Sequence, residues 1–213
     1  MFRKRVNGSF ARFRLGRPDG PDLFGRNDSM KRKTAKDILA DSFRELAQKK
    51  KIDKITIKDI AANGGYSPAT FYRQFKDKYD LIAWDYARGV EEIMNRIGSE
   101  GYSWREMLID GANYYQERKE YLTNLLLHTS GLDSFVHHMT EINYCYLKKH
   151  VMRAIGEETP DEKTEMVLRV YCLGTVRLTC EWILGRYEAG PEELAEVFEN
   201  ALPAPLRPYL IIE

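Results

Sequence analysis

The sequence contains little of what marks secreted, membrane-spanning or metal-binding proteins. Its three cysteines, Cys145, Cys172 and Cys180, are scattered and lack C-x-x-C spacing. This argues against a disulfide framework and a zinc site, and for a reducing compartment. No run of about 18 apolar residues could span a bilayer, and the start of the chain lacks the apolar core of a signal peptide. We therefore expect a cytoplasmic protein with no membrane partner.

Catalytic motifs are missing as well. The sequence has no P-loop and none of the patterns G-x-G-x-x-G, H-E-x-x-H or G-x-S-x-G. His137 and His138 are adjacent, so on a helix they point about 100° apart and make a poor metal pair. His128 and His150 are isolated. We therefore predict that the protein is not an enzyme and that it carries neither a metal nor a cofactor.

Charge is unevenly distributed along the chain. The net charge is +1 over 213 residues. Residues 1–29 carry seven basic and three acidic side chains, residues 30–80 carry thirteen and seven, and residues 81–213 carry thirteen and twenty-two. A basic N-terminal third on an acidic remainder is typical of a nucleic-acid-binding module joined to a domain that avoids the polyanion. Chance scatter is the alternative, which is weakened because the basic segment coincides with the motif described next.

Residues 56–81 have the pattern of two short helices joined by a tight turn. Thr56 is a good N-cap for the first helix, and Asp59 follows where negative charge suits a helix start. Gly64 and Gly65 end that helix because glycine adopts positive φ at little cost. The pattern predicts a helix-turn-helix whose second helix enters the major groove of DNA. A solvated helical hairpin without this function is the alternative.

The second helix of the motif is expected from Pro68 to Phe75. Ser67 is its N-cap, and Pro68 stands at the first helical position, where the missing N–H costs nothing. Phe71 and Phe75 share one face and can pack inward. The outward face then presents hydroxyl, phenol, amide and guanidinium groups that suit phosphate oxygens and base edges, namely those of Thr70, Tyr72, Arg73 and Gln74.

This stretch resembles the DNA-binding core of the TetR family of transcriptional regulators. That family has the pattern T-x-x-x-I-A followed by G-[VY]-S-x-x-T-[LF]-Y-x-x-F-x-x-K-x-x-L, and every position is matched between Thr56 and Leu81. The resemblance extends over residues 34–81. From Tyr114 onward the chain resembles, more loosely, the regulators of dihydroxyacetone kinase operons within the family.

The resemblance implies an all-α fold with an N-terminal three-helix helix-turn-helix domain and a C-terminal helical bundle for effector binding and dimerisation. We place the DNA-binding domain at residues 30–78 and the bundle at residues 79–213. Residues 1–29 are broken by glycine and proline, so we predict a disordered basic segment; a basic arm entering the minor groove is the alternative. Apolar periodicity predicts about nine helices, at residues 31–50, 57–63, 68–75, 78–97, 104–119, 120–129, 132–155, 161–187 and 191–201.

The resemblance further implies a homodimer that binds palindromic double-stranded DNA with half-sites about 34–36 Å apart. The dimer is expected to form through the helices at 161–201, because the first of them is apolar nearly all round and Gly174 allows close approach. Thr56, Lys76 and Lys78 are expected on phosphates. The full set of expected DNA contacts is Thr56, Ser67, Pro68, Ala69, Thr70, Tyr72, Arg73, Gln74, Lys76 and Lys78.

A small-molecule effector site is also implied, within the C-terminal bundle. The lining residues that we predict for it are Tyr115, His128, Tyr144 and Arg177. On this interpretation the protein is a ligand-responsive repressor of the TetR type. The alternative is a co-activator or adaptor of the same fold, whose C-terminal bundle binds a protein partner instead of a small molecule.

Overall fold

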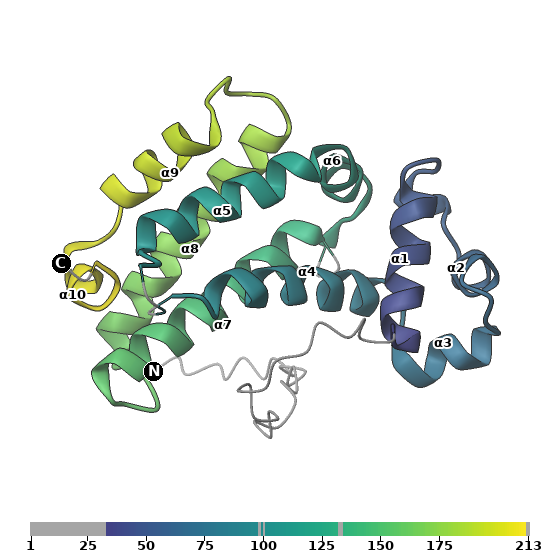
Figure 1. Ribbon diagram of the computed structural model, residues 1–213, viewed down its shortest axis with the longest axis horizontal. Helices are drawn as coiled ribbons and strands as arrows, with labels where there is room; N and C mark the ends of the chain where they lie inside the picture. Colours follow the sequence, from purple (N-terminus) through teal and green to yellow (C-terminus); the bar gives the residue numbers. More distant parts are fainter. Residues whose placement is uncertain (1–32, 98, 100, 132–133, 212–213) are drawn as a thin grey trace, which may run out of the picture. The chain divides into compact units, whose positions relative to one another are not determined.

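The computed structural model describes residues 33–97, 99, 101–131 and 134–211, and within them the chain is all α-helical, as predicted (Figure 1). From Lys33 on, these residues belong to one compact unit. The predictions for residues 1–29 lie outside the described part. The described elements are α1 (Ala35–Ala47), η1 (Ile52–Lys54), α2 (Ile57–Asn63), α3 (Pro68–Gln74), α4 (Lys78–Met94), α5 (Trp104–Glu117), α6 (Lys119–His128), α7 (Phe135–Ile155), α8 (Glu162–Ile183), α9 (Pro191–Asn200), η3 (Ala204–Leu206) and α10 (Arg207–Leu210).

Helices α1, α2 and α3, here called the reading head, begin at side chains that cap them. Thr34 accepts from the backbone N–H of Asp37, whose carboxylate accepts in return from the N–H of Thr34. This capping box starts α1 at Ala35, four residues later than the periodicity predicts. Both predicted N-caps of the motif are confirmed: Thr56 caps α2 and forms a capping box with Asp59, and Ser67 caps α3.

A small aromatic core holds the reading head together. Phe71 is fully buried and Phe75 is 3% exposed, so both rings pack inward as the sequence predicts. Their centroids lie 5.7 Å apart, and Phe75 also packs edge-on against Trp84 of α4. The Nζ of Lys36 lies 5.3 Å from the centroid of the Phe75 ring and covers it from the solvent side. The position of α3 is therefore fixed by buried rings and not by its outward face.

The remaining helices, α5 to α10, are called the body. α5 packs mainly on α9, and α7 packs on α8 and α4. α4 contacts both α1 and the body. The domain boundary that we predict, between residues 78 and 79, therefore falls at the start of a helix that packs against both predicted domains. α7 begins at Phe135 with Ser134 as its N-cap. α8 is shorter than predicted and is capped by Asp161.

The described part of the C-terminal tail packs on the body. Pro203 precedes a 3-10 turn and the short helix α10, two elements that the periodicity did not predict. Leu206 and Leu210 are 1% and 2% exposed and join a cluster that includes Leu147 and Leu168. These contacts hold α10 against α7.

Candidate nucleic-acid interface and cavity

The outward face of α3 is largely exposed to solvent. Tyr72 is 60% exposed, in contrast to its neighbour Phe71. Ser67, Pro68, Ala69 and Arg73 are exposed, and Thr70 and Gln74 are partly so. The helix therefore turns its apolar side inward and its predicted DNA contacts outward.

Polar groups at the start of α3 form a short chain on this face. The hydroxyls of Ser67 and Thr70 lie 3.2 Å apart, and the guanidinium of Arg73 donates to the Thr70 Oγ1 at 2.9 Å. Arg73 thus lies along the helix with donors left over, since a guanidinium has five N–H groups. This arrangement places three side chains of the predicted contact set side by side along α3.

The start of α4 differs from what the sequence predicts for its lysines. The Nζ of Lys78 donates to the carbonyl oxygens of Ile52 and Ile55, at 2.8 and 3.0 Å. Burial lowers the pKa of Lys78, and the nearby carboxylate of Asp53 opposes that shift. Lys78 is therefore held against the reading head, while Lys76 is exposed.

The backbone amides at the start of α4 are also occupied. The carboxylate of Asp77 accepts from the N–H groups of Tyr79 and Asp80 at 2.9 Å. The Asp80 carboxylate accepts from the N–H of Lys76 at 3.0 Å. A phosphate would have to displace these carboxylates to reach the amides, so an anion contact here depends on side-chain charge.

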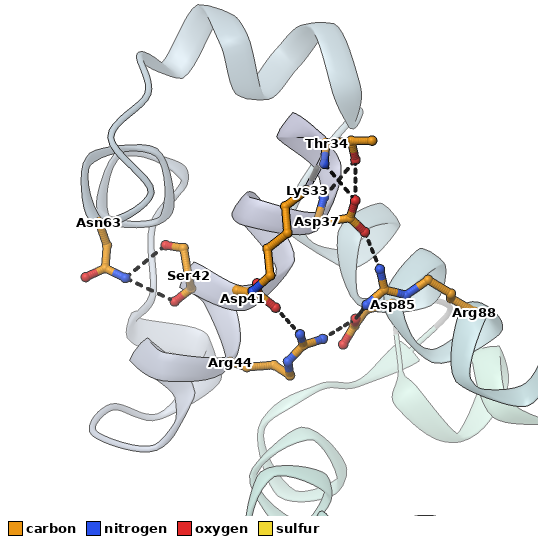
Figure 2. A network of polar contacts seen from close by, with 9 residues as sticks. All are labelled: Lys33, Thr34, Asp37, Asp41, Ser42, Arg44, Asn63, Asp85 and Arg88. Atoms are coloured by element: carbon orange, nitrogen blue, oxygen red, sulfur yellow. Dashed lines mark hydrogen bonds and ion pairs between the residues drawn. The ribbon is translucent and has the colours of Figure 1, made fainter. Parts of the chain in front are cut away.

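A charged network joins α1 to α4 (Figure 2). The Arg44 guanidinium bridges Asp41 of its own helix and Asp85 of α4, and Asp85 is only 7% exposed. Arg88, one turn further along α4, pairs with Asp37 near the start of α1. Burial disfavours the charge on Asp37, but the hydrogen bonds of Thr34 and the Arg88 charge outweigh it and lower the pKa of Asp37. Two guanidinium groups thus hold the reading head to α4 along one face of α1.

A second polar contact within the reading head is drawn in Figure 2, at Ser42 and Asn63. The amide nitrogen of Asn63 donates to the Ser42 Oγ at 3.1 Å, and this hydroxyl donates to the carbonyl of Ile60 at 2.7 Å. Ser42 is buried, so these bonds satisfy its hydroxyl in the interior. They fix α1 against α2.

A third polar contact joins the reading head to α6. The Asn124 amide nitrogen donates to the carbonyls of Ala47 and Lys50, at 2.7 and 2.8 Å, and its oxygen accepts from the N–H of Ile52 at 3.2 Å. Ala47 is the last residue of α1, where carbonyls lack partners within the helix. One side chain of the body therefore caps α1 and orders the turn that follows. Asn124 was not among the predicted site residues, although an amide within the apolar stripe of α6 is a visible signal.

The body contains a cavity of about 90 Å³ between α4, α5, α7, α8 and α9. None of its lining residues is charged. Its polar groups come from tyrosine, threonine, asparagine, cysteine and tryptophan side chains. The lining residues are Val90, Ile93, Met94, Trp104, Met107, Leu108, Gly111, Ala112, Tyr114, Tyr115, Asn143, Leu147, Tyr171, Cys172, Thr175, Val176, Thr179, Leu194 and Phe198.

One of the four predicted pocket residues, Tyr115, lines this cavity, and the other three lie elsewhere. Tyr144 donates its phenol O–H to the carboxylate of Glu165 on α8. Arg177 is on the surface, where it pairs with Glu181. His128 is the last residue of α6. Helical spacing alone could not show which of Tyr115 and Tyr144 lines the cavity, because both lie on apolar helical faces.

An apolar stripe is exposed on α8. Met166, Val170 and Leu173 are 62%, 69% and 55% exposed, and their spacing of four and three residues places them on one face. Gly174 continues this face, and a β-carbon built there would have no atom within 4 Å. Val197 of the neighbouring α9 is 49% exposed. Large apolar side chains gathered on one face are typical of an interaction surface.

Across residues 33–97, 99, 101–131 and 134–211, no group of three His, Cys, Asp or Glu side chains is placed to hold a metal ion. Of the helices described here, none has the length and apolar character needed to cross a bilayer.

Two sequence profiles match the chain, one for each half of the fold. Residues 39–83 match the profile of bacterial regulatory proteins of the tetR family. Residues 102–203 match the profile of a transcriptional regulator C-terminal region. The two matches include the reading head with the start of α4, and most of the body.

Individual relatives agree with this assignment. The chain is 24% identical over 98 residues to the HTH-type dhaKLM operon transcriptional activator DhaS of Lactococcus lactis subsp. lactis, a match that spans 46% of this chain and 52% of that protein. A solved structure of the dihydroxyacetone kinase operon activator DhaS aligns with a TM-score of 0.58 at 20% identity, over 82% of this chain and 97% of that one. Thermus thermophilus FadR, a TetR-family repressor solved with lauroyl-CoA, aligns with a TM-score of 0.54 at 19% identity, over 84% and 96%. At these identities the structural likeness shows the fold.

Proposed function

Because this chain belongs to the TetR family of transcriptional regulators, we propose that it is a homodimeric repressor whose DNA affinity is set by a small-molecule effector. A TetR-type regulator is a DNA-binding protein and not an enzyme. The proposal adds the dimer, the sign of regulation and the effector to that family assignment.

The observation that carries the proposal is the exposed polar face of α3 on a helix held by buried rings. Phe71 and Phe75 leave α3 little freedom, so its outward face is presented to a partner without first having to be ordered. We assign base-edge and phosphate contacts to Ser67, Thr70, Tyr72 and Arg73. Phosphate contacts are assigned to Thr56, Lys76 and Lys78, with Lys76 better placed than Lys78 because its ammonium is exposed.

Dimerisation is supported by the apolar stripe of α8 together with α9. Two copies that bury the same face produce a two-fold pair, the commonest symmetric arrangement. Such a pair presents two copies of α3 to successive major grooves, about 34–36 Å apart. The exposed Gly174 leaves room for the backbone of the second copy to approach.

DNA binding is tested by fluorescence anisotropy with labelled DNA from the region upstream of the protein's own gene, at several salt concentrations. Arg73→Ala should weaken binding by about 10- to 100-fold, as expected for a guanidinium that contacts a base. Arg153→Ala is the matched control, because Arg153 is exposed at the far end of α7, and it should bind like the parent. Equal affinity for the Arg73 variant and the control would remove α3 from the interface.

Dimerisation is tested by light scattering coupled to gel filtration. Val170→Glu places a charge in the centre of the α8 stripe and should yield monomers. Leu127→Glu is the control: this leucine is 61% exposed on α6, away from the stripe, and the variant should remain dimeric. A dimeric Val170→Glu protein would place the interface elsewhere.

An adaptor of the same fold is the second candidate, in which the body binds a protein partner. One observation favours it: the relatives named DhaS are described as activators. A reporter gene separates the two candidates. Gly111→Ala narrows the cavity without a clash, so it should raise the effector concentration that a repressor needs for its response and leave the response of an adaptor unchanged.

A further inference from the structure

Two buried phenols and one amide form a polar group at the wall of the cavity. The Tyr86 and Tyr115 hydroxyl oxygens lie 2.8 Å apart. The Asn143 amide nitrogen donates to the Tyr86 oxygen at 2.6 Å and to the Met139 carbonyl at 2.8 Å. Tyr115 and Asn143 line the cavity, and Tyr86 lies behind them in the core, 3% exposed. Such groups are costly to bury unless their hydrogen bonds are made.

The group of Tyr86, Tyr115 and Asn143 has one donor and one acceptor to spare. The two phenols hold two protons, and their mutual bond uses one of them, so one O–H has no acceptor among the described residues. Both protons of the Asn143 amide are in use, while its oxygen receives no bond from that part of the chain. The spare O–H and the spare carbonyl oxygen lie in the same group, one hydrogen bond apart.

The electrostatics of the cavity exclude an ion as its natural occupant. Burial raises the pKa of Tyr86 well above its usual value, and the neighbouring phenol of Tyr115 adds to the shift. Burial likewise raises the pKa of Tyr115, against the hydrogen bonds from Tyr86 and Asn143. Both phenols are therefore neutral at physiological pH, and the lining contains no charged side chain. An ion that entered would lose its hydration without gaining a counter-charge.

We propose that the cavity binds a small aliphatic alcohol, whose hydroxyl donates to the Asn143 amide oxygen and accepts from the phenol pair of Tyr86 and Tyr115. A hydroxyl is the group that matches one spare acceptor and one spare donor. The methionine, leucine and valine side chains around it take the hydrocarbon part. A cavity of about 90 Å³ limits the molecule to a few carbon atoms, since a 150 Å³ cavity is filled by benzene.

The same group is placed to transmit occupancy to the reading head, a step that rests on the proposed function. Tyr86 is the residue after Asp85 on α4, and Asp85 accepts from Arg44 of α1 in the network of Figure 2. A ligand hydroxyl that changes the hydrogen bonds of Tyr86 therefore acts on α4 next to the ion pair of Asp85 with Arg44, which joins α4 to the reading head. Gly89, one turn along, allows the Tyr114 ring to lie against α4, because a β-carbon there would be 2.6 Å from that ring. α4 is thus in close contact with the cavity wall at two successive turns.

Binding is measured by NMR on the full chain labelled with ¹³C at the methionine methyl groups. Met94 and Met107 line the cavity, and Met166 on the surface of α8 is the internal control. The probes are butan-1-ol, butan-2-one, butyrate and butylammonium. We expect butan-1-ol to shift the Met94 and Met107 signals and not that of Met166, with butan-2-one several-fold weaker because it can only accept. The two ions should bind at least about tenfold more weakly than the alcohol.

Variants assign the hydroxyl contact. Tyr115→Phe removes one hydroxyl and should lower the affinity for butan-1-ol about tenfold. Tyr121→Phe is the matched control, because this phenol is also buried but lies outside the cavity, with an oxygen that has no partner among the described residues. It should bind like the parent. If Tyr115→Phe folds poorly, Gly111→Ala is the second variant: it fills part of the cavity where a β-carbon meets nothing within 4 Å and should also weaken the alcohol several-fold.

Three results would overturn the inference: ions binding as tightly as the alcohol, Met94 and Met107 unmoved up to the solubility limit of butan-1-ol, or equal alcohol affinity in Tyr115→Phe and Tyr121→Phe. These titrations contain no DNA, so each of these results leaves the DNA-binding proposal standing. Conversely, the loss of DNA binding expected of Arg73→Ala is measured without alcohol, and its failure leaves the cavity assignment intact. Loss of operator affinity on adding butan-1-ol in the parent, but not in Tyr115→Phe, would support the link through α4.

Discussion

The reading head and the body are both made of short helices, but their functional groups are held in different ways. The side chains that cap the helices of the reading head find partners close in sequence: Thr34 bonds Asp37, Thr56 bonds Asp59, and Ser67 bonds Thr70. The polar contacts that the body makes between elements span much longer distances along the chain. Asn124 caps α1 across 77 residues, and Asn143 reaches Tyr86 across 57. Local bonds fix an element, whereas distant ones fix how elements meet.

The difference has a functional consequence. A DNA-contacting helix must keep one shape, and local caps with two buried rings provide it. The response that we propose for the body requires connections between distant elements. The single side chains of Asp85, Asn124 and Tyr86 make such connections between α4, α6, α7 and the reading head.

The largest effect should come from Phe71→Ala, which empties the core of the reading head. Truncation of a fully buried phenylalanine costs about 3–5 kcal/mol, a large fraction of the stability of a small helical unit. We expect loss of DNA binding and a lower unfolding midpoint by circular dichroism. Tyr72→Ala, next in sequence but 60% exposed, should keep the midpoint and lose DNA affinity. If the two variants unfolded alike, the division of α3 into an inward and an outward face would be wrong.

Asn124→Ala tests the distant cap of α1. It leaves the carbonyls of Ala47 and Lys50 and the N–H of Ile52 without their partner, at a cost of about 2–3 kcal/mol. Because the contact joins the body to the reading head, we expect weaker DNA binding as well as a lower free energy of unfolding in urea. Glu120→Ala, at an exposed position of the same helix, is the control. A wild-type unfolding curve for Asn124→Ala would deny the cap any energetic role.

Gly89→Ala tests the close approach of α4 and the Tyr114 ring. A methyl group 2.6 Å from the ring atoms must displace the ring or the helix, at a cost of about 1–3 kcal/mol. Gly111→Ala is the opposite case: its β-carbon meets nothing within 4 Å, so the variant should be neutral or gain up to about 1 kcal/mol from helix propensity. Thermal unfolding of both proteins measures the contrast, and equal midpoints would show that Tyr114 moves aside freely.

Variants of the two lysines near the start of α4 should distinguish a contribution of charge to DNA binding from a contribution to the stability of the fold. Lys76→Ala should reduce the salt slope of DNA binding by about 1 and leave stability unchanged, because one phosphate contact is lost. Lys78→Ala should lower the stability of the reading head by about 1 kcal/mol, since its ammonium donates to Ile52 and Ile55. An equal loss of slope in both variants would mean that Lys78 leaves its carbonyls to bind phosphate.

Asp37→Asn should give the smallest effect and make it pH-dependent. The folded-state pKa of Asp37 is lowered, so its carboxylate stabilises the fold above the ordinary value of 3.8 and loses this contribution as the pH falls through the folded-state pKa. We expect a difference of about 0.5–1 kcal/mol at neutral pH that shrinks in urea titrations below pH 3.8. Glu92→Gln, an exposed carboxylate of α4, should show no such trend. A difference that persists at low pH would point to the lost cap alone and not to the charge.

Much of the reading head could be predicted from its residues. Thr56, the glycine pair at 64 and 65, and Ser67-Pro68 act on the backbone within a few residues of themselves, so their effect does not depend on the rest of the fold. The inward turn of Phe71 and Phe75 followed from helical spacing. The expected ends of α1 were less exact, because Thr34 starts the helix later and the caps at its end come from Asn124.

The cavity could not be predicted in the same way. Tyr115 and Tyr144 both lie on apolar helical faces, and only the packing of α5 on α9 and of α7 on α8 places one at the cavity and the other beside Glu165. Lys78 matches a family position and has the right charge for a phosphate, yet its ammonium lies against two carbonyls from η1 and the residue that follows it. Asp85 is visible in the sequence as a carboxylate among apolar residues of α4, which indicates a buried ion pair. Its partner Arg44 could not be predicted, because it is 41 residues away.

The sequence by itself determined the helices, their caps and the presence of a DNA-reading motif, because these depend on backbone conformation and hydrogen bonds within a few residues. The tertiary structure decided which phenols meet Asn143, where the uncharged cavity lies, and how α1 is held to α4 and α6. Those features depend on the packing of side chains that are tens of residues apart, and periodicity along one helix carries no information about which residue of another helix will face it.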